Sequence, residues 1–241
     1  MNKQIGKRLK EQGFTLVEIM VAMAISGIVM SGIYTVYYSQ QKSYMAQEQV
    51  VAMQQNLRAA MFYMEREIRR AGCDPTQDAN AGIQDIGWDA DENRYTSIRF
   101  TLDIHDGVDN DGDGSVDESD EEGNVDGDTD DTNEDITYSL ADNDGDGDSD
   151  LERNGDLIAE NIDVLDFVYL DDDSPPKVTA NIDEIRSVQI TIVSRTGRAA
   201  PGYTDTASYA NQQGTVILAA QNDNFRRRRL TTSIRCRNLG L

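Results

Sequence analysis

The sequence is poor in the side chains on which most catalytic and metal centres depend. Its 241 residues include one histidine, two cysteines and one tryptophan. This scarcity excludes a multi-histidine metalloenzyme and a thiol-rich zinc module. A hydrolase that uses its carboxylates is the rival class, but no nucleophile elbow and no serine pairing with His105 supports it. We therefore predict a protein that is not an enzyme and has no catalytic residues.

Positive charge is also scarce, and one segment has none. The chain has 22 Lys and Arg against 44 Asp and Glu, a formal net charge of −22. Residues 103–152 contain 22 of the acidic residues and no Lys or Arg, so the whole net charge belongs to this block. A nucleic-acid partner requires a basic surface, and we expect no such partner here.

A long apolar run follows a short basic leader at residues 1–13. The run covers residues 14–38, which as a helix would extend roughly 37 Å and cross a hydrocarbon core of about 30 Å. The basic leader should stay cytoplasmic, which places the chain after the run outside the inner leaflet. The small residues of a signal-peptidase site are missing after the run. Glu18 lies inside it, and a carboxylate there usually has a designated partner.

The segment Gly13-Phe14-Thr15-Leu16-Val17-Glu18, after its basic leader, resembles the N-terminal signal of type IV prepilins and of type II secretion pseudopilins. The resemblance implies that a membrane-embedded prepilin peptidase cleaves between Gly13 and Phe14 and N-methylates Phe14. It also implies that the Glu18 carboxylate meets the N-terminal amine of a neighbouring subunit. Such pairing neutralises two buried charges when subunits assemble.

Beyond the run, apolar periodicity predicts an α+β protein. Leu57, Met61, Met64 and Ile68 form one helical stripe, and Gly72 and Pro75 follow as stop signals. Alternating apolar residues then predict five strands around residues 98–104, 136–140, 165–169, 188–192 and 230–236. The expected architecture is a transmembrane or filament-core helix (14–38), its amphipathic continuation (39–72) and an antiparallel β-sheet head (73–241) with calcium-loop insertions in residues 103–152.

Several later phrases, including MFYMEREIRRAG, LERNGDLIAENIDVLDFVYLDDD and RRRRLTTSIRCRNL, resemble PilW-type minor pilins, which are related to GspJ pseudopilins. The resemblance implies a single-pass inner-membrane protein with a periplasmic head that later reaches the pilus or cell surface. Its implied partners are other minor and major pilins, prepilin peptidase, the inner-membrane assembly machinery, and the membrane before assembly. A type IV pilus subunit acting in assembly near the tip is the first hypothesis; a secretion pseudopilin and a pilus-presented adhesive module are the alternatives.

The acidic block contains a twelve-residue pattern typical of a calcium loop. Hard dications prefer six to eight oxygen ligands, and alternate residues of a tightly turned loop supply them. Gly114 stands at the sixth position and Val116 at the eighth. The candidate ligands are Asp109, Asp111, Asp113, Ser115, Asp117 and Asp120. The sequence therefore predicts bound Ca²⁺ in a loop between strands.

A second copy repeats the first half of this pattern. Its candidate ligands are Asp142, Asp144, Asp146, Asp148 and Asp150. The twelfth position is Arg153, so the loop lacks its closing carboxylate unless Glu152 or the first loop supplies one. The alternative for the whole block is a solvated acidic linker.

The two cysteines suit an exported chain, in which disulfides form and persist. Cys73 follows the predicted helix and Cys236 lies on the apolar face of the last predicted strand. We predict a disulfide between them; two buried free thiols are the alternative.

Overall fold

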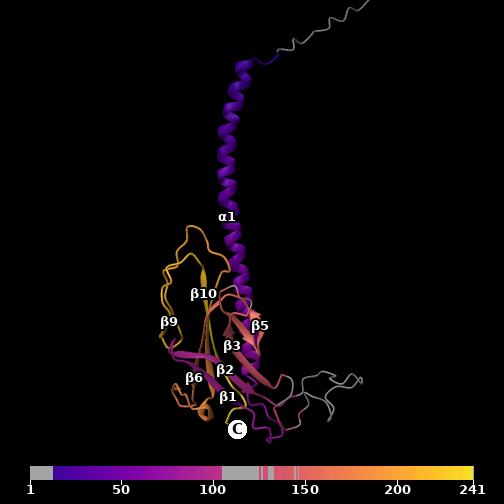
Figure 1. Ribbon diagram of the computed structural model, residues 1–241, viewed down its shortest axis with the longest axis vertical. Helices are drawn as coiled ribbons and strands as arrows, with labels where there is room; N and C mark the ends of the chain where they lie inside the picture. The colour runs from indigo at the N-terminus through magenta and orange to yellow at the C-terminus, as the bar shows by residue number, and fades with distance from the viewer. Residues whose placement is uncertain are drawn as a thin grey trace, which may run out of the picture. The chain divides into compact units, whose positions relative to one another are not determined.

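The computed structural model describes residues 13–104, 125, 127–129, 133–143, 145 and 147–240. Its elements confirm the predicted α+β class (Figure 1). One long helix, α1 (Leu16–Ile68), precedes the strands, and a 3₁₀ turn, η1 (Ile182–Glu184), interrupts them. The strands are β1 (Ile83–Asp89), β2 (Arg94–Thr101), β3 (Asp135–Ala141), β4 (Asp150–Arg153), β5 (Asp156–Ala159), β6 (Ile162–Leu170), β7 (Ser187–Arg195), β8 (Tyr209–Ala210), β9 (Val216–Leu218) and β10 (Arg227–Arg235).

The chain divides into two compact units between Glu48 and Gln49, inside α1. In the first unit, the described residues are Gly13 to Glu48, and nearly all of their side chains are exposed. In the second unit, the rest of α1 packs on the sheet. The second unit therefore contains the hydrophobic core.

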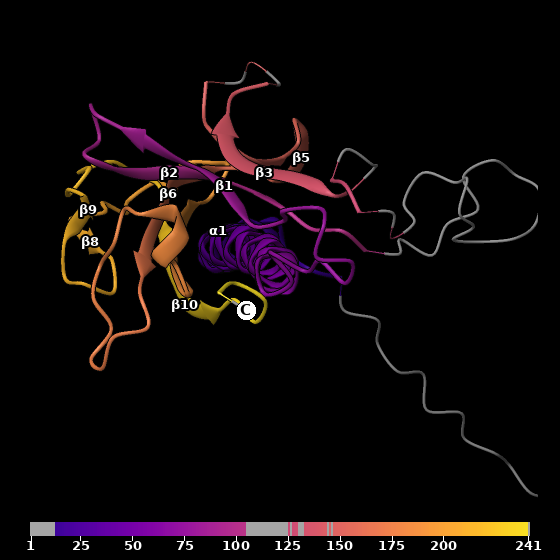
Figure 2. The ribbon, with the colours of Figure 1, turned by 90° about the horizontal axis from the view of Figure 1, so that it is seen from below.

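The second half of α1 buries one face because its apolar residues recur at helical spacing. The predicted stripe of Leu57, Met61, Met64 and Ile68 is at most 5% exposed. These side chains form one core with residues from all eight strands of the main sheet, including Phe100, Tyr138, Leu165, Ile190 and Ile234. Figure 2 shows the curled sheet around this part of α1, with β2 and β3 on one side and β10 on another.

The main sheet is antiparallel throughout its described pairs. Its order is β10-β7-β6-β2-β3-β4-β5, and β1 pairs with β2 off this path. A separate pair, β8 and β9, contributes Ile217 to a small cluster with Val164 and Val193. The five predicted strands correspond to β2, β3, β6, β7 and β10.

The first predicted strand ends earlier than expected, at Thr101 rather than near residue 104. The backbone leaves the β-ladder there because the next two N–H groups donate to carbonyls outside it. Leu102 N–H donates to the Glu134 carbonyl (3.0 Å), and Asp103 N–H donates to the Cys73 carbonyl (2.7 Å), just past α1. Asp103 is fully buried, although its place in the alternation predicted an outward side chain.

Two of the strands that periodicity did not predict, β4 and β5, form a hairpin beside the acidic block. Asn154 and Gly155 connect them with φ values of 52° and 86°. Positive φ at both positions suits the tight turn that Asn-Gly favours, since glycine meets no Cβ penalty there. This hairpin begins at Asp150, so the second predicted calcium loop ends in a strand.

Candidate functional site

The predicted processing site lies immediately before α1. Gly13, Phe14 and Thr15 are outside regular structure, and Leu16 is the first helical residue. The Phe14 side chain is 85% exposed. The peptide bond between Gly13 and Phe14 therefore precedes the helix, where its backbone is not held by the helical ladder. The leader residues 1–12 lie outside the described part of the chain.

Glu18 has a local partner that the sequence reasoning missed. Thr15 donates from its backbone N–H and from its hydroxyl to Glu18 Oε2, both at 2.8 Å. The Glu18 N–H donates back to Thr15 Oγ1 at 3.3 Å. This reciprocal pair is a capping box, which satisfies amide groups that the first helical turn leaves without partners. The Thr-x-x-Glu spacing before an apolar run was its signal in the sequence.

The helix beyond this cap presents apolar side chains on every face. All side chains from Gly13 to Met45 are exposed, among them Ile28 at 75% and Tyr34 at 68%. Within the described residues, α1 alone is long and apolar enough to cross a membrane, by length and composition. Apolar surface on this scale favours transfer out of water by about 25 cal/mol per Å². This segment is therefore more stable in a nonaqueous environment than in water.

The first predicted calcium loop, Asp109 to Asp120, lies outside the described residues, as do Asp144 and Asp146 of the second. The structure does place three carboxylates of the second loop. Asp142 Oδ1 accepts from the Gly145 N–H at 2.9 Å, and Asp150 Oδ1 accepts from the Asn161 N–H at 2.8 Å. Asp148 Oδ2 accepts a hydrogen bond from the Arg195 guanidinium at 2.6 Å.

These three carboxylates thus bind protein groups on different segments. In the described ranges, no group of three His, Cys, Asp or Glu side chains could hold a metal ion. Calcium binding stays a prediction.

Arg153, at the position where the second loop lacks a closing carboxylate, has a structural partner on α1. Its Nε lies 3.1 Å from Glu67 Oε2, and both side chains are mostly buried. The Tyr138 hydroxyl donates to the same carboxylate oxygen at 2.6 Å. Burial, and then this hydrogen bond, raise the pKa of Tyr138, which keeps the hydroxyl protonated. The residue that departs from the calcium pattern therefore connects β4 to the helix.

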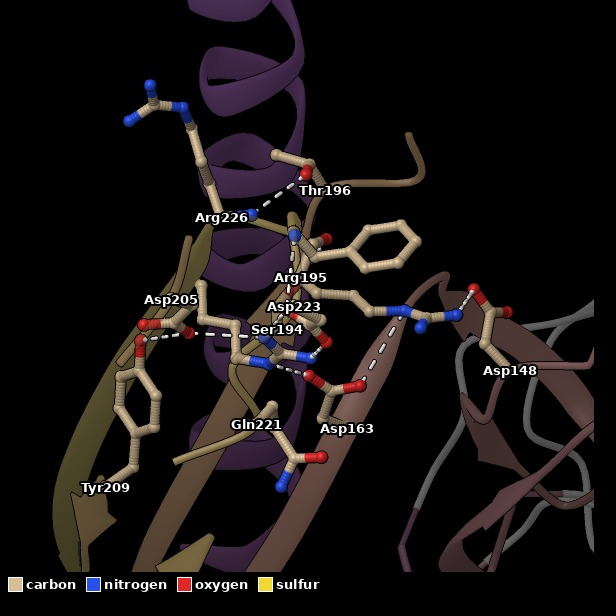
Figure 3. A network of polar contacts seen from close by, with 12 residues as sticks. Asp148, Asp163, Ser194, Arg195, Thr196, Asp205, Tyr209, Gln221, Asp223 and Arg226 are labelled. Carbon is tan, nitrogen blue, oxygen red and sulfur yellow. Dashed lines mark hydrogen bonds and ion pairs between the residues drawn. The ribbon is translucent and has the colours of Figure 1, made fainter. Parts of the chain in front are cut away.

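A larger ion network connects the end of the acidic block to the sheet (Figure 3). Arg195 contacts Asp148 and, at 3.6 Å, Asp163. Asp163 also accepts from Arg227 at 2.5 Å. Arg227, only 3% exposed, further contacts Asp205 and Asp223 at 3.2 and 2.6 Å.

The charges in this network depend on one another. Burial raises the pKa of Asp163 while Arg227 opposes the rise, and the hydrogen bond to Asp223 raises the pKa of Arg227. Removing one member would leave a buried charge without its partner, which is strongly destabilising.

Cys73 and Cys236 are not bonded to each other in the structure, and the disulfide stays a prediction. Cys236 is 3% exposed and belongs to the main core, while Cys73 is half-buried against it. Burial raises the pKa of Cys236 to about 12. Because the thiolate is the reactive form, burial lowers the reactivity of the Cys236 thiol at neutral pH.

Comparison with known proteins finds a motif that spans the predicted processing site. Residues 8–34 match a family model described as the prokaryotic N-terminal methylation motif. A solved type IV-like pilin from Thermus thermophilus is similar over 78% of this chain and 97% of its own, at 12% identity and a TM-score of 0.45. No curated protein sequence matches the chain. The chain therefore has a prepilin-type methylation motif at the start of an apolar helix.

Replacing Thr15 by Ala should loosen the first turn of α1, because the capping hydroxyl is lost. Loss of an N-cap costs typically about 1 kcal/mol, or roughly a fivefold change in opening. We expect the Glu18 amide to exchange about fivefold faster in the labelled protein in micelles, measured by NMR. Thr35→Ala is the matched control, since Thr35 bonds back to the Ser31 carbonyl within the helix. Equal Glu18 exchange in both variants would contradict the cap.

Proposed function

We propose that the protein is a type IV pilin-like filament subunit, acting as a minor pilin in pilus assembly. The methylation motif over residues 8–34 carries this proposal, because the apolar helix begins just after the predicted cleavage junction. A leader of this kind, followed by an exposed apolar helix, suits a subunit stored in a membrane and later packed against other subunits. The minor role and a place near the tip rest on the PilW-type resemblance.

The proposed mechanism starts with cleavage between Gly13 and Phe14. Cleavage removes the basic leader and creates an α-amine on Phe14, four residues before Glu18. In the capping box, the Glu18 carboxylate accepts two hydrogen bonds from Thr15. In an assembled filament, the methylated amine of a neighbouring subunit would give this carboxylate a charged partner. The ion pair forms only between subunits, so it favours assembly over isolated helices in the membrane.

Mature protein from native membranes should begin at N-methylated Phe14, as measured by intact-mass and N-terminal peptide mass spectrometry. We expect the leader to be retained in a strain without prepilin peptidase, which is the control. Glu18→Gln should still be processed, because the junction is unchanged, but should copurify less with sheared filaments. Glu48→Gln, which changes the next acidic residue along α1, should copurify normally. A chain starting at Met1 in peptidase-positive cells would contradict the proposal.

We also propose that the first acidic loop, Asp109 to Asp120, binds Ca²⁺ and stabilises the head. Its support is the spacing of five carboxylates around Gly114, which provides the oxygen ligands that calcium requires. Bound calcium would neutralise part of the acidic block's charge. Calcium in the second loop stays a prediction; there, Arg195 contacts Asp148 and the Asn161 amide donates to Asp150.

Calcium titrated into the full-length protein in detergent should give a binding heat in calorimetry. Extracellular loops of this kind bind at about 10⁻⁴–10⁻³ M. Asp109→Asn combined with Asp111→Asn should abolish the heat, since two carboxylate ligands are neutralised. Glu160→Gln, which changes an exposed carboxylate outside both loops, should leave the heat unchanged. The calcium proposal fails if no heat develops up to several millimolar.

A further inference from the structure

β10 is the edge strand of the main sheet. It pairs with β7 along all nine of its residues, from Arg227↔Arg195 to Arg235↔Ser187, with no register shift. No other strand in the described part of the chain pairs with it. The opposite end of the sheet is β5, which has only four residues. β10 is therefore a long, regular strand with one free side.

The hydrogen bonds at both ends of β10 show which backbone groups are free. Thr196 N–H donates to the Arg226 carbonyl at 2.9 Å, and Cys236 N–H donates to the Arg186 carbonyl at 3.0 Å. Both bonds continue the β7 register, so the even-numbered residues of β10 exchange bonds with β7. The N–H and C=O groups of the odd-numbered residues, including Thr231 and Ser233, then point away from the sheet. Beyond the strand, the outward Arg237 N–H is taken by the Arg69 carbonyl of the helix end.

The free edge is flanked by unpaired positive charge. The side chains of Arg228, Arg229, Arg235 and Arg237 are exposed, and none forms an ion pair with a described carboxylate; Arg229 donates to the Ala210 carbonyl. This is unusual in a chain with twice as many acidic as basic residues. Charges on an edge strand discourage unselective pairing. The same arginines would favour an incoming strand that carries carboxylates.

The strand is also held firmly from behind. Leu230 packs against the main core and Ile234 is fully buried in it. The Thr232 hydroxyl donates to the Glu65 carboxylate of α1. Because β7 and α1 already fix the backbone of β10, a partner strand pays the ordering entropy for its own residues only.

We propose that the free edge of β10 is a docking strand for an extended acidic segment of a partner protein, which would add to the sheet as its next strand. Main-chain hydrogen bonds to the odd-numbered residues supply affinity, and the flanking arginines select carboxylates on the incoming strand. The proposal goes beyond filament membership and does not depend on the methylation motif.

The backbone part of the proposal is tested with the full-length chain in a neutral detergent. The probe is a fluorescein-labelled nonapeptide of alternating Glu and Val, and binding is followed by anisotropy. Ser233→Pro should abolish binding, because proline removes an outward N–H that β7 does not use. Ser233→Ala keeps this N–H and should bind within twofold of the unaltered chain. Trp88 fluorescence confirms that both variants are folded.

The charge part uses the same probe. Arg228→Gln combined with Arg235→Gln should weaken binding roughly fivefold, as expected for the loss of two exposed ion pairs. Arg198→Gln, an exposed arginine outside β10, should leave binding unchanged. A nonapeptide of alternating Lys and Val should not bind.

Three results would overturn the proposal. The first is equal affinity for the Glu and Lys peptides, and the second is equal binding by Ser233→Pro and Ser233→Ala. The third is a self-associated chain that Ser233→Pro dissociates, because the edge would then belong to a second copy.

Discussion

The apolar surface of the first half of α1 is the constraint on which the rest of the protein depends. Side chains from Gly13 to Met45 are exposed, and the stretch contains residues such as Ile28 and Tyr34 that favour a nonaqueous environment. No other part of the first unit covers them, because its described residues are this helix and its start. The exposed apolar helix therefore needs a nonaqueous environment, which both lipid and neighbouring subunits provide.

The apolar face of the second half of the same helix is covered by the chain itself. From Met53 onward one face of α1 is buried, and the sheet supplies the other side of the core. Polar contacts then fix the helix end. Gly72 N–H donates to the Thr101 carbonyl at 3.0 Å, and the Glu67 carboxylate accepts hydrogen bonds from Arg153 and Tyr138. The second half of α1 packs within the chain, while the apolar side chains of its first half are uncovered. Such a helix is suited to anchoring a folded head.

Much of this organisation could be predicted from periodicity and local motifs. The buried helix stripe followed from its spacing, and five strands followed from the alternation of apolar residues. The prepilin-type motif is contiguous in the sequence, and residues 8–34 match the family model of the methylation motif. Such features are local, so neighbouring residues in the sequence already contain the signal.

Some features that prediction missed depend on contacts between residues distant in the sequence. Others had a local sequence signal that was not recognised. The Thr15 and Glu18 capping box and the Asn154-Gly155 turn belong to the second kind. The buried position of Asp103 belongs to the first, since its backbone bonds to Cys73 across the fold. So do the ion pairs of Asp148 and Arg153, which periodicity along the chain cannot reveal.

Site-specific photocrosslinking in living cells tests most directly whether the first half of α1 is covered. A benzophenone amino acid in place of Ile28 should form adducts with lipid or with other filament subunits. The same group in place of Val178, which is 58% exposed on the head, should form no lipid adducts. Absence of both kinds of adduct at Ile28, with the protein present at normal abundance, would contradict the account.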